Sequence, residues 1–297
     1  MKVFLTGATG YIGSVVVERL LAAGHEVTGL ARSALAARKL EDAGARSWPG
    51  DLHDAESIQR AAREADGVIH MASTGGPDAR QADEQAIAAI LRAINGTGKP
   101  FIYTSGVWVL GNTKDSVADE ETPLDPTPLV AWRPAVEERV LASAAHGVRS
   151  IVLRPAMVYG RDGGIIGEMV EAGRRKGVVR FVGTGENRWS LIHVEDLADL
   201  YVKALEKAPA GTLLMVAAGE SMRVRDVAEA AGRAVGAHVR VESWPIEQAR
   251  ERLGPYADAL VLDQQVSAAK AMRLLDWKPQ APSLLEELAQ DAKPSSD

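Results

Sequence analysis

Short apolar runs alternate with amphipathic segments along much of the chain. Six runs have the length and composition of buried strands: Val3–Leu5, Val27–Leu30, Val68–Met71, Phe101–Tyr103, Ile151–Leu153 and Leu213–Val216. Between them, apolar residues recur at helical spacing, as in residues 14–23, which Gly24 ends, and in residues 87–94. This alternation predicts a parallel sheet with helices on both faces.

A glycine-rich turn follows the first predicted strand directly. Gly7 permits a tight turn, Gly10 lets the backbone approach a pyrophosphate, and Gly13 lets the next helix pack against the strand. The free amides at that helix N-terminus then attract the anion. Because a strand and a helix flank the motif, it predicts dinucleotide binding. The predicted contacts are Gly7, Thr9, Gly10, Tyr11, Ile12 and Gly13.

The residues after the second predicted strand indicate which dinucleotide binds. A site for a nucleotide without a 2′-phosphate usually has a carboxylate here, bound to the ribose hydroxyls. In this chain Ala31 holds that position, and Arg32 and Ser33 follow. A guanidinium and a hydroxyl suit an additional phosphate, which favours NADP(H) as the cofactor. The alternative is that Arg32 is an ordinary solvated charge.

The amino-acid composition excludes several kinds of catalytic and binding site. The 297 residues include no cysteine, which excludes disulfides, thiolate catalysis and Cys-ligated metals. The six histidines form no pair at a metal-ligand spacing, so no metal site is expected. A net charge of −6 gives no support for a nucleic-acid partner. No run reaches the ~18 apolar residues of a membrane span, and the first residues lack a signal-peptide pattern. A cytoplasmic protein with a small-molecule substrate is expected.

Together these patterns predict a Rossmann-type α/β fold, a doubly wound parallel sheet that carries a smaller C-terminal substrate-binding lobe. Residues 1–160 are expected to form the dinucleotide-binding domain, with the sheet completed by residues 190–218. Residues 161–189 and 219–297 are expected to form the lobe. It should lie over the carboxyl ends of the strands, where ligands bind in such sheets.

Several further motifs occur in a characteristic order. They are Gly-Asp-Leu at 50–52, Val-Ile-His-Met-Ala-Ser at 68–73, Tyr-Thr-Ser-Gly at 103–106, Leu-Arg-Pro-Ala-Met-Val-Tyr-Gly at 153–160 and Leu-Ile-His-Val-Glu-Asp at 191–196. With these motifs the chain resembles the extended short-chain dehydrogenases/reductases of the epimerase/dehydratase-like group. The resemblance implies that Asp51 and Leu52 face the adenine. The other cofactor contacts that it implies are Met71, Ala72, Ser73, Thr104, Arg133, Pro155 and Ala156.

The chain departs from this family at the catalytic triad, in which a Ser or Thr, a Tyr and a Lys normally act together. Flanking motifs place Leu129 at the tyrosine position and Arg133 at the lysine position, and Ser105 lies beside the serine position. No tyrosine occurs between Tyr103 and Tyr159, so no shift of the alignment restores the proton donor. The chain therefore resembles atypical members, which keep the cofactor site and change the chemistry.

Four side chains are candidates for the changed chemistry. Arg133 would hold the ribose, and Ser105 or Thr104 would hydrogen-bond a carbonyl. Tyr159 is the alternative phenol unless it only packs. The candidate walls of an apolar substrate pocket, which would otherwise be core residues, are Trp108, Trp132 and Trp189. His193 and Asp196 are expected to be structural, because a His-Val-Glu-Asp run is typical of a helix start.

The sequence leaves three functional interpretations. The first is an NADP(H)-dependent oxidoreductase that reduces a small, mostly apolar ketone, imine or activated alkene. The second is an NADP(H)-binding sensor without turnover, which needs no proton donor. The third is a sugar-nucleotide epimerase or dehydratase with bound NAD, which Ala31, Arg32 and the missing tyrosine disfavour. By resemblance, a homodimer is expected through helices near residues 87–94 and 135–145.

Overall fold

A seven-stranded parallel sheet forms the centre of the computed structural model, which describes residues 1–219 and 221–291. Its strands are β1 (Lys2–Thr6), β2 (Glu26–Ala31), β3 (Arg46–Pro49), β4 (Gly67–His70), β5 (Pro100–Thr104), β6 (Arg149–Pro155) and β11 (Thr212–Val216). They lie in the order β11-β6-β5-β4-β1-β2-β3, and every neighbouring pair is parallel. The strand order reverses between β1 and β4, which opens a ligand crevice at their carboxyl ends.

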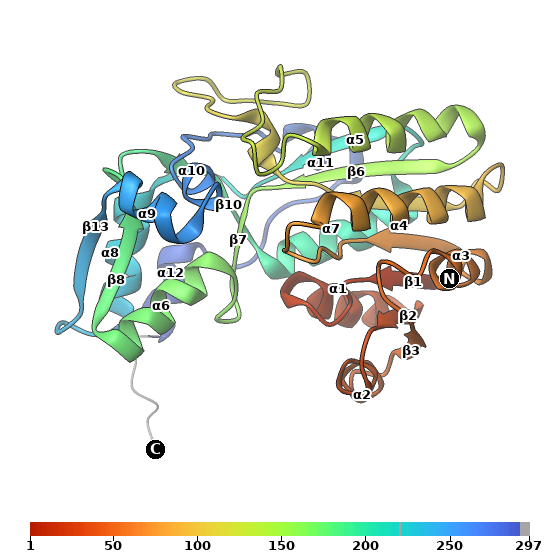
Figure 1. Ribbon diagram of the computed structural model, residues 1–297, viewed down its shortest axis with the longest axis horizontal. Coiled ribbons are helices and arrows are strands. Elements are labelled where there is room, and N and C mark those ends of the chain that lie inside the picture. The colour runs from red at the N-terminus through yellow and green to blue at the C-terminus, as the bar shows by residue number, and fades with distance from the viewer. Residues whose placement is uncertain (220, 292–297) are drawn as a thin grey trace.

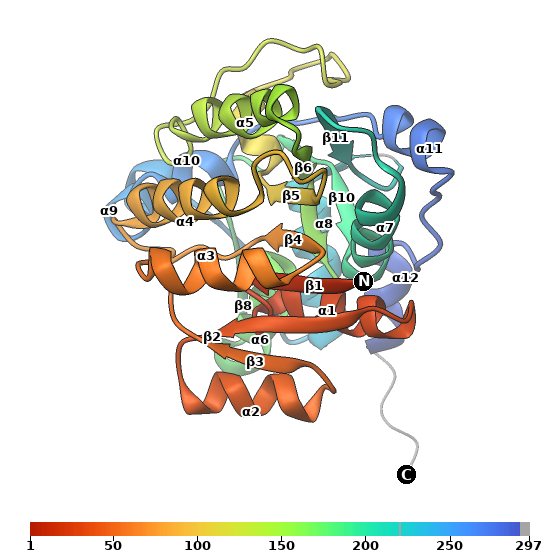
Figure 2. The ribbon, with the colours of Figure 1, turned by 90° about the vertical axis from the view of Figure 1, so that its right-hand side faces the viewer.

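Helices cover both faces of this sheet, so the predicted doubly wound α/β fold is confirmed (Figure 2). On one face lie α1 (Tyr11–Ala22), α7 (Val194–Lys207) and α11 (Ala269–Leu275), and on the other lie α3 (Ala55–Glu64), α4 (Ala79–Ile94) and α5 (Arg133–Ala142). The helix α2 (Ala34–Asp42) packs beside β3 at the edge. The strands read as continuous apolar runs because both faces are buried.

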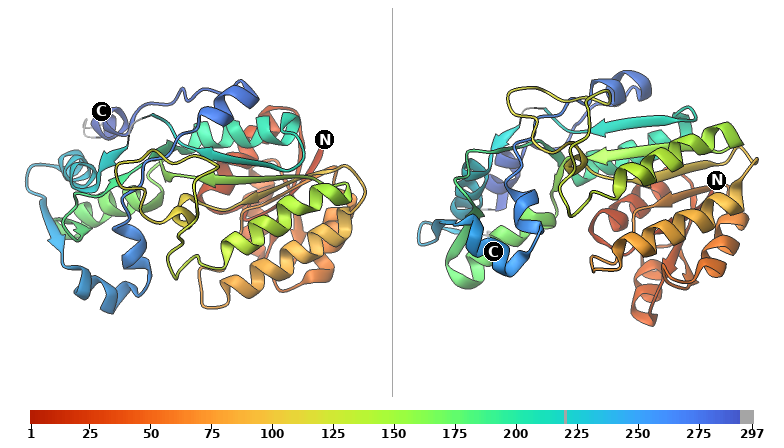
Figure 3. Two further views of the ribbon diagram at one scale, coloured as in Figure 1. Left: turned by 90° about the horizontal axis from the view of Figure 1, so that it is seen from above. Right: turned by 45° about the horizontal axis from the view of Figure 1, so that its top comes forward.

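A smaller lobe stands beside the carboxyl ends of the strands (Figures 1 and 3). Its elements are α6 (Gly164–Lys176), β8 (Val178–Val182), α8 (Val224–Val235), β13 (Arg240–Trp244), α9 (Ile246–Leu253), α10 (Tyr256–Leu260) and α12 (Leu284–Asp291). The strands β8 and β13 pair in parallel, and the lobe has its own apolar core around Met169, Phe181 and Val227. Short pairs join the two parts: β7 (Met157–Tyr159) with β10 (Leu191–His193), and β9 (Arg188–Trp189) with β12 (Met222–Arg223).

One segment within the range expected for the lobe packs on the larger domain instead. The helix α11 contacts α7 and β11, and Leu275 and Trp277 are buried in the core of that face. The indole N–H of Trp277 donates to the carbonyl oxygen of Asp196 at 3.1 Å, which fixes the segment against α7. The chain therefore returns to the sheet layer after α10, before α12 packs in the lobe against α8.

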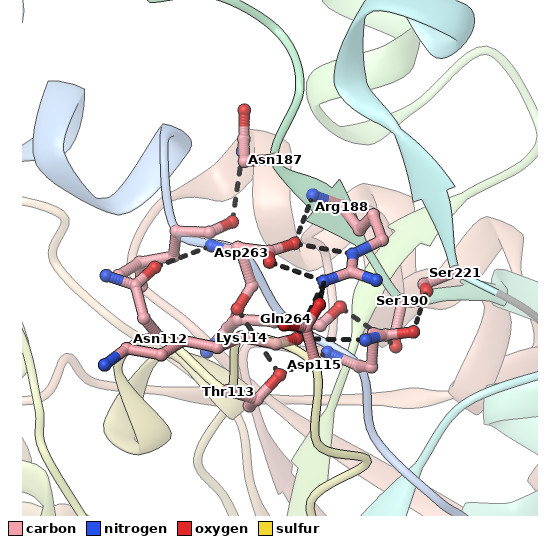
Figure 4. Close-up of polar contacts among 12 residues, drawn as sticks. Asn112, Thr113, Lys114, Asp115, Asn187, Arg188, Ser190, Ser221, Asp263 and Gln264 are labelled. Carbon is pink, nitrogen blue, oxygen red and sulfur yellow. Dashed lines mark hydrogen bonds and ion pairs between the residues drawn. The ribbon is translucent and has the colours of Figure 1, made fainter.

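A cluster of hydrogen bonds and ion pairs holds the acid-rich loop of residues 111–128 in place (Figure 4). The Asp263 carboxylate accepts from the Arg188 side chain at 2.7 and 2.9 Å, and Arg188 also donates to the carbonyl oxygen of Lys114. The Arg188 guanidinium holds the pKa of the Asp263 carboxyl below its usual value. The Gln264 amide donates to the carbonyl oxygen of Gly111 at 2.9 Å. The loop is thus anchored to segments of both parts of the molecule.

Across the described ranges, no helix combines the length and the apolar character that crossing a membrane requires.

Candidate active site

The glycine turn forms a cradle that only glycine can build. Gly7 has a φ of +78°, and a Cβ there would lie 2.8 Å from the amide nitrogen of Ala72. A Cβ on Gly13 would lie 2.0 Å from the carbonyl oxygen of Gly7. Gly10 is the N-cap of α1 and provides no side-chain cap, so the first amides of the helix are free for an anion. This geometry fits the pyrophosphate of a dinucleotide.

The predicted adenosine contacts lie along the same edge of the sheet. Arg32 and Ser33 follow β2 directly, and both are exposed, although Ser33 also caps α2 by accepting from the amide of Ala36. Asp51 is exposed and Leu52 is buried in the loop after β3. Arg32, Ser33, Asp51 and Leu52 lie outside the large cavity of the protein.

That cavity is lined by residues that follow β5 and end β6 and by residues of the small lobe, and its volume is about 760 Å³. This volume suits a nicotinamide and a small substrate. Of the predicted cofactor contacts, those that line it are Tyr11, Ile12, Ser73, Thr104, Arg133, Pro155 and Ala156. Trp108, Trp132 and Leu129 contribute apolar wall, as do Met157 and Ile165. The structure therefore brings the nicotinamide half of the predicted site together with a mostly apolar chamber.

Ser105 lies in the wall of the cavity with its hydroxyl uncommitted. Its amide donates to the carbonyl oxygen of Leu153 at 2.8 Å, which fixes the backbone at the end of β5. Its Oγ is buried and finds no hydrogen-bond partner among the described residues. The neighbouring Thr104 hydroxyl is already paired with the phenol of Tyr201 at 2.6 Å. A buried polar atom without a partner has a large desolvation penalty. The Ser105 side chain would have to rotate for its hydroxyl to reach a ligand in the cavity, because the Oγ is buried.

Arg133 is the first residue of α5, and its guanidinium is held by the sheet below. One nitrogen donates to the hydroxyl oxygen of Tyr103 at 3.1 Å and to the carbonyl oxygen of Thr104 at 3.0 Å. The guanidinium also lies 4.8 Å from the centre of the Trp132 ring, a cation–π arrangement. These contacts engage only some of the N–H donors of the guanidinium. Its positive charge lies at the wall of the cavity.

A buried chain of hydrogen bonds continues from Arg133 beneath the cavity. The Tyr103 hydroxyl donates to the Asp83 carboxylate at 2.9 Å, and the other Asp83 oxygen lies 2.9 Å from His70 Nε2. His70 Nδ1 lies 2.7 Å from the hydroxyl of Thr6, which accepts from the amide of Ala72. Both ring nitrogens of His70 thus have a partner within hydrogen-bond distance. This chain links Arg133 to the backbone that surrounds the glycine turn.

The Tyr103→Phe substitution is expected to lower the free energy of unfolding by about 1–3 kcal/mol, because the buried Asp83 carboxylate loses a donor. Chemical denaturation measures the change. Tyr201→Phe is the matched control, since it removes a buried phenol whose partner, Thr104, is uncharged, and a smaller loss of about 1 kcal/mol is expected. An equal loss in both variants would show that the carboxylate adds nothing to this bond.

Two predicted site residues lie elsewhere. The Tyr159 hydroxyl donates to the carbonyl oxygen of Pro282 at 2.8 Å, and its ring packs edge-to-face on His193, so this phenol holds the C-terminal segment and does not line the cavity. Trp189 is 2% exposed in the core of the lobe, and its indole donates to the carbonyl oxygen of Leu260. Neither residue reaches the chamber that was expected to contain it.

His193 and Asp196 of the His-Val-Glu-Asp run make structural contacts. His193 Nδ1 accepts from the amide of Glu195 and so caps α7. The Asp196 carboxylate accepts from the amides of Gln280 and Ala281. Within the ranges that the structure describes, no group of acidic and histidine side chains has a metal-binding arrangement.

Sequence reasoning missed two polar residues of the cavity, Arg80 on α4 and Tyr256 on α10. Tyr256 lies in the small lobe, where no periodic pattern connects it with β5. The only local signal is the Gly-Pro pair at 254–255, which marks a turn before a short helix. The charged side chains that line the cavity are Arg80 and Arg133, and its described lining includes no Asp, Glu, Lys or His.

The fold and the glycine cradle define a class of protein, the dinucleotide-binding enzymes built on a Rossmann sheet. Residues 3–217 match the NAD dependent epimerase/dehydratase family, and the chain belongs to that family.

Several known proteins are similar over most of this chain. The Schizosaccharomyces pombe protein named "Uncharacterized protein C2A9.02" is 36% identical over 299 residues, which cover 98% of this chain and 99% of that protein. The 4-hydroxy-2-methyl-3-oxo-4-farnesyl-3,4-dihydroquinoline-1-oxide ketoreductase of Stigmatella aurantiaca is 26% identical over 84% of this chain and 78% of its own length. The dTDP-glucose 4,6-dehydratase of Bacillus anthracis, solved with NAD, superposes with a TM-score of 0.82 at 18% identity, over 97% of this chain and 96% of that chain.

Proposed function

We propose that this protein is an NADP(H)-dependent reductase of small, mostly apolar ketones. The observation that carries the proposal is the cavity of about 760 Å³, whose mostly apolar lining includes Ser105 and several of the predicted nicotinamide contacts. Ketones are favoured over protonated imines because the Arg133 guanidinium lines the chamber and its described lining includes no carboxylate. Arg80 adds less positive charge there, since its guanidinium is paired with Glu84 at 2.8 Å. A ketoreductase among the relatives is consistent with this reaction.

The residues of the chain have separate tasks in this reaction. When bound, the reduced nicotinamide supplies the hydride. The glycine cradle binds the pyrophosphate, and Arg133 carries the positive charge that faces the nicotinamide ribose. Ser105 donates its free hydroxyl to the substrate carbonyl and orients it. Arg133 itself keeps its proton at neutral pH, so it orients groups and does not act as an acid.

Turnover is tested with purified protein, NADPH and a panel of neutral alkyl and aryl ketones, by following the loss of NADPH absorbance. NADPH oxidation that depends on the ketone is expected, with formation of the matching alcohol. Tight NADPH binding without oxidation across the panel would contradict the proposal and favour a nucleotide sensor. Reduction of iminium ions alone would contradict the substrate class.

Arg32 is proposed to bind the 2′-phosphate that distinguishes NADPH from NADH. The Arg32→Ala substitution is expected to weaken NADPH binding about 10- to 100-fold, as for the loss of a charged hydrogen bond, and to leave NADH binding unchanged. Calorimetric titration with both nucleotides measures this. Arg46→Ala is the control, because Arg46 is an exposed arginine at the start of β3 that pairs with Glu26. An equal effect on NADPH and NADH would contradict the assignment.

A further inference from the structure

Four of the five tyrosine hydroxyls of this protein are already engaged in hydrogen bonds. Those four are Tyr11 with the carbonyl oxygen of Gly160, Tyr103 with Asp83, Tyr159 with the carbonyl oxygen of Pro282, and Tyr201 with Thr104. Tyr256 is the exception, because its hydroxyl has no hydrogen-bond partner in residues 1–219 and 221–291. This hydroxyl is not among the buried polar atoms, so it stays accessible and free to hydrogen-bond a ligand in the cavity that Tyr256 lines.

Tyr256 lies where such a contact is needed. It is the first residue of α10 and lines the cavity from the side of the small lobe. Its ring meets the indole of Trp108 edge-to-face with 5.7 Å between the ring centres, and Trp108 comes from the segment directly after Ser105. Behind Tyr256, Ala257 and Ala259 are fully buried, so α10 is fixed in place. Tyr256 and Ser105 therefore line the same chamber, and Tyr256 contacts the segment that follows Ser105.

The other polar side chains of the chamber are poorer proton donors than a free phenol. The hydroxyls of Ser73, Thr104 and Ser105 and the guanidinium groups of Arg80 and Arg133 are weaker acids than a phenol. The Tyr11 phenol already donates to the carbonyl oxygen of Gly160. Burial raises the pKa of Tyr256 to about 12, and the Glu168 carboxylate contributes to the shift. At neutral pH this phenol consequently holds its proton. It can still protonate an alkoxide, which is a far stronger base than a phenolate.

We propose that Tyr256 donates the proton to the substrate oxygen, a role that rests on the proposed reductase function. In this step the carbonyl carbon accepts a hydride from the reduced nicotinamide nucleotide, and the π electrons of the C=O bond move to the oxygen. That oxygen takes the phenolic proton, which gives the alcohol and the oxidised nucleotide. The Tyr256 phenolate then regains a proton from water.

The Tyr256→Phe variant tests this role, with Tyr159→Phe as the matched loss of a phenol outside the cavity. Ketone reduction by Tyr256→Phe is expected to fall about 100- to 10,000-fold, the usual contribution of a positioned acid. Tyr159→Phe is expected to keep ketone reduction within about threefold of the original protein, since its phenol bonds only to Pro282. Full ketone reduction by Tyr256→Phe, or an equal loss in Tyr159→Phe, would overturn the proposal.

A binding measurement gives a second readout that does not depend on turnover. A ketone that is a substrate is titrated into the protein with oxidised NADP, where no reduction can occur, and tryptophan fluorescence reports binding. Tyr256→Phe is expected to weaken ketone binding about tenfold through the lost hydrogen bond and to leave NADP binding unchanged. Unchanged ketone binding would overturn the contact. If the original protein reduces no ketone, the proposed function fails, whereas an active Tyr256→Phe protein defeats only the role of Tyr256.

Discussion

Replacing Glu137 by Gln is expected to lower the free energy of unfolding by about 3–5 kcal/mol, because it leaves a buried guanidinium without its counter-charge. Glu137 on α5 is 2% exposed, and Arg154 on β6 is 3% exposed. Arg154 Nε lies 3.1 Å from both carboxylate oxygens, and Nη2 makes a further close contact with one of them. Urea denaturation measures the change.

Two further variants show whether the loss of stability comes from the buried ion pair. Glu138→Gln changes the exposed neighbour on the same helix and is expected to alter stability by less than about 0.5 kcal/mol. Replacing Glu137 and Arg154 together by Met is expected to restore most of the stability, since a buried ion pair often contributes little more than apolar side chains of similar volume. A loss below about 1 kcal/mol in Glu137→Gln would mean that water reaches this pair.

The Gly13→Ala substitution is expected to disrupt the nucleotide site and the fold around it. The added Cβ would lie 2.0 Å from the carbonyl oxygen of Gly7, so the turn or the helix must move. Such overpacking lowers stability by about 1–3 kcal/mol. Loss of one or two charged hydrogen bonds from the amides of α1 would weaken NADPH binding by about 10- to 1,000-fold.

The matched control for Gly13→Ala is Ser14→Ala in the same helical turn. Ser14 is exposed, and its hydroxyl donates only to the carbonyl oxygen of Tyr11. Nucleotide binding and thermal unfolding of this control are expected to match those of the original protein. A Gly13→Ala protein that binds NADPH with full affinity would show that the cradle is not the pyrophosphate site.

The sheet and the glycine cradle were predictable because local sequence determines them. The six predicted runs lie within or overlap strands β1, β2, β4, β5, β6 and β11, since buried parallel strands are continuous apolar segments. The short strand β3 is not among the six predicted runs. Its pattern is weak because it is an edge strand with partly exposed side chains.

The chamber was harder to predict because it depends on contacts between distant segments. Trp108 and Trp132 both line it, whereas Trp189, from a similar sequence setting, points into the core of the lobe. Likewise, Tyr159 follows a strand that ends at the site, but the late segment around Pro282 captures its hydroxyl. Tyr256 reaches the chamber only through the packing of α10, which no local pattern reveals.

The small lobe is built from several separate segments of the chain, which limits how the protein can be redesigned. The backbone enters the small lobe after β6, returns for α7 and β11, and enters again for α8 to α10. It then leaves for α11 before α12 completes the lobe. No single cut therefore releases the lobe as a cassette for exchange with a homologue. Redesign of substrate range has to proceed by replacing side chains in the chamber wall, with the backbone scaffold kept whole.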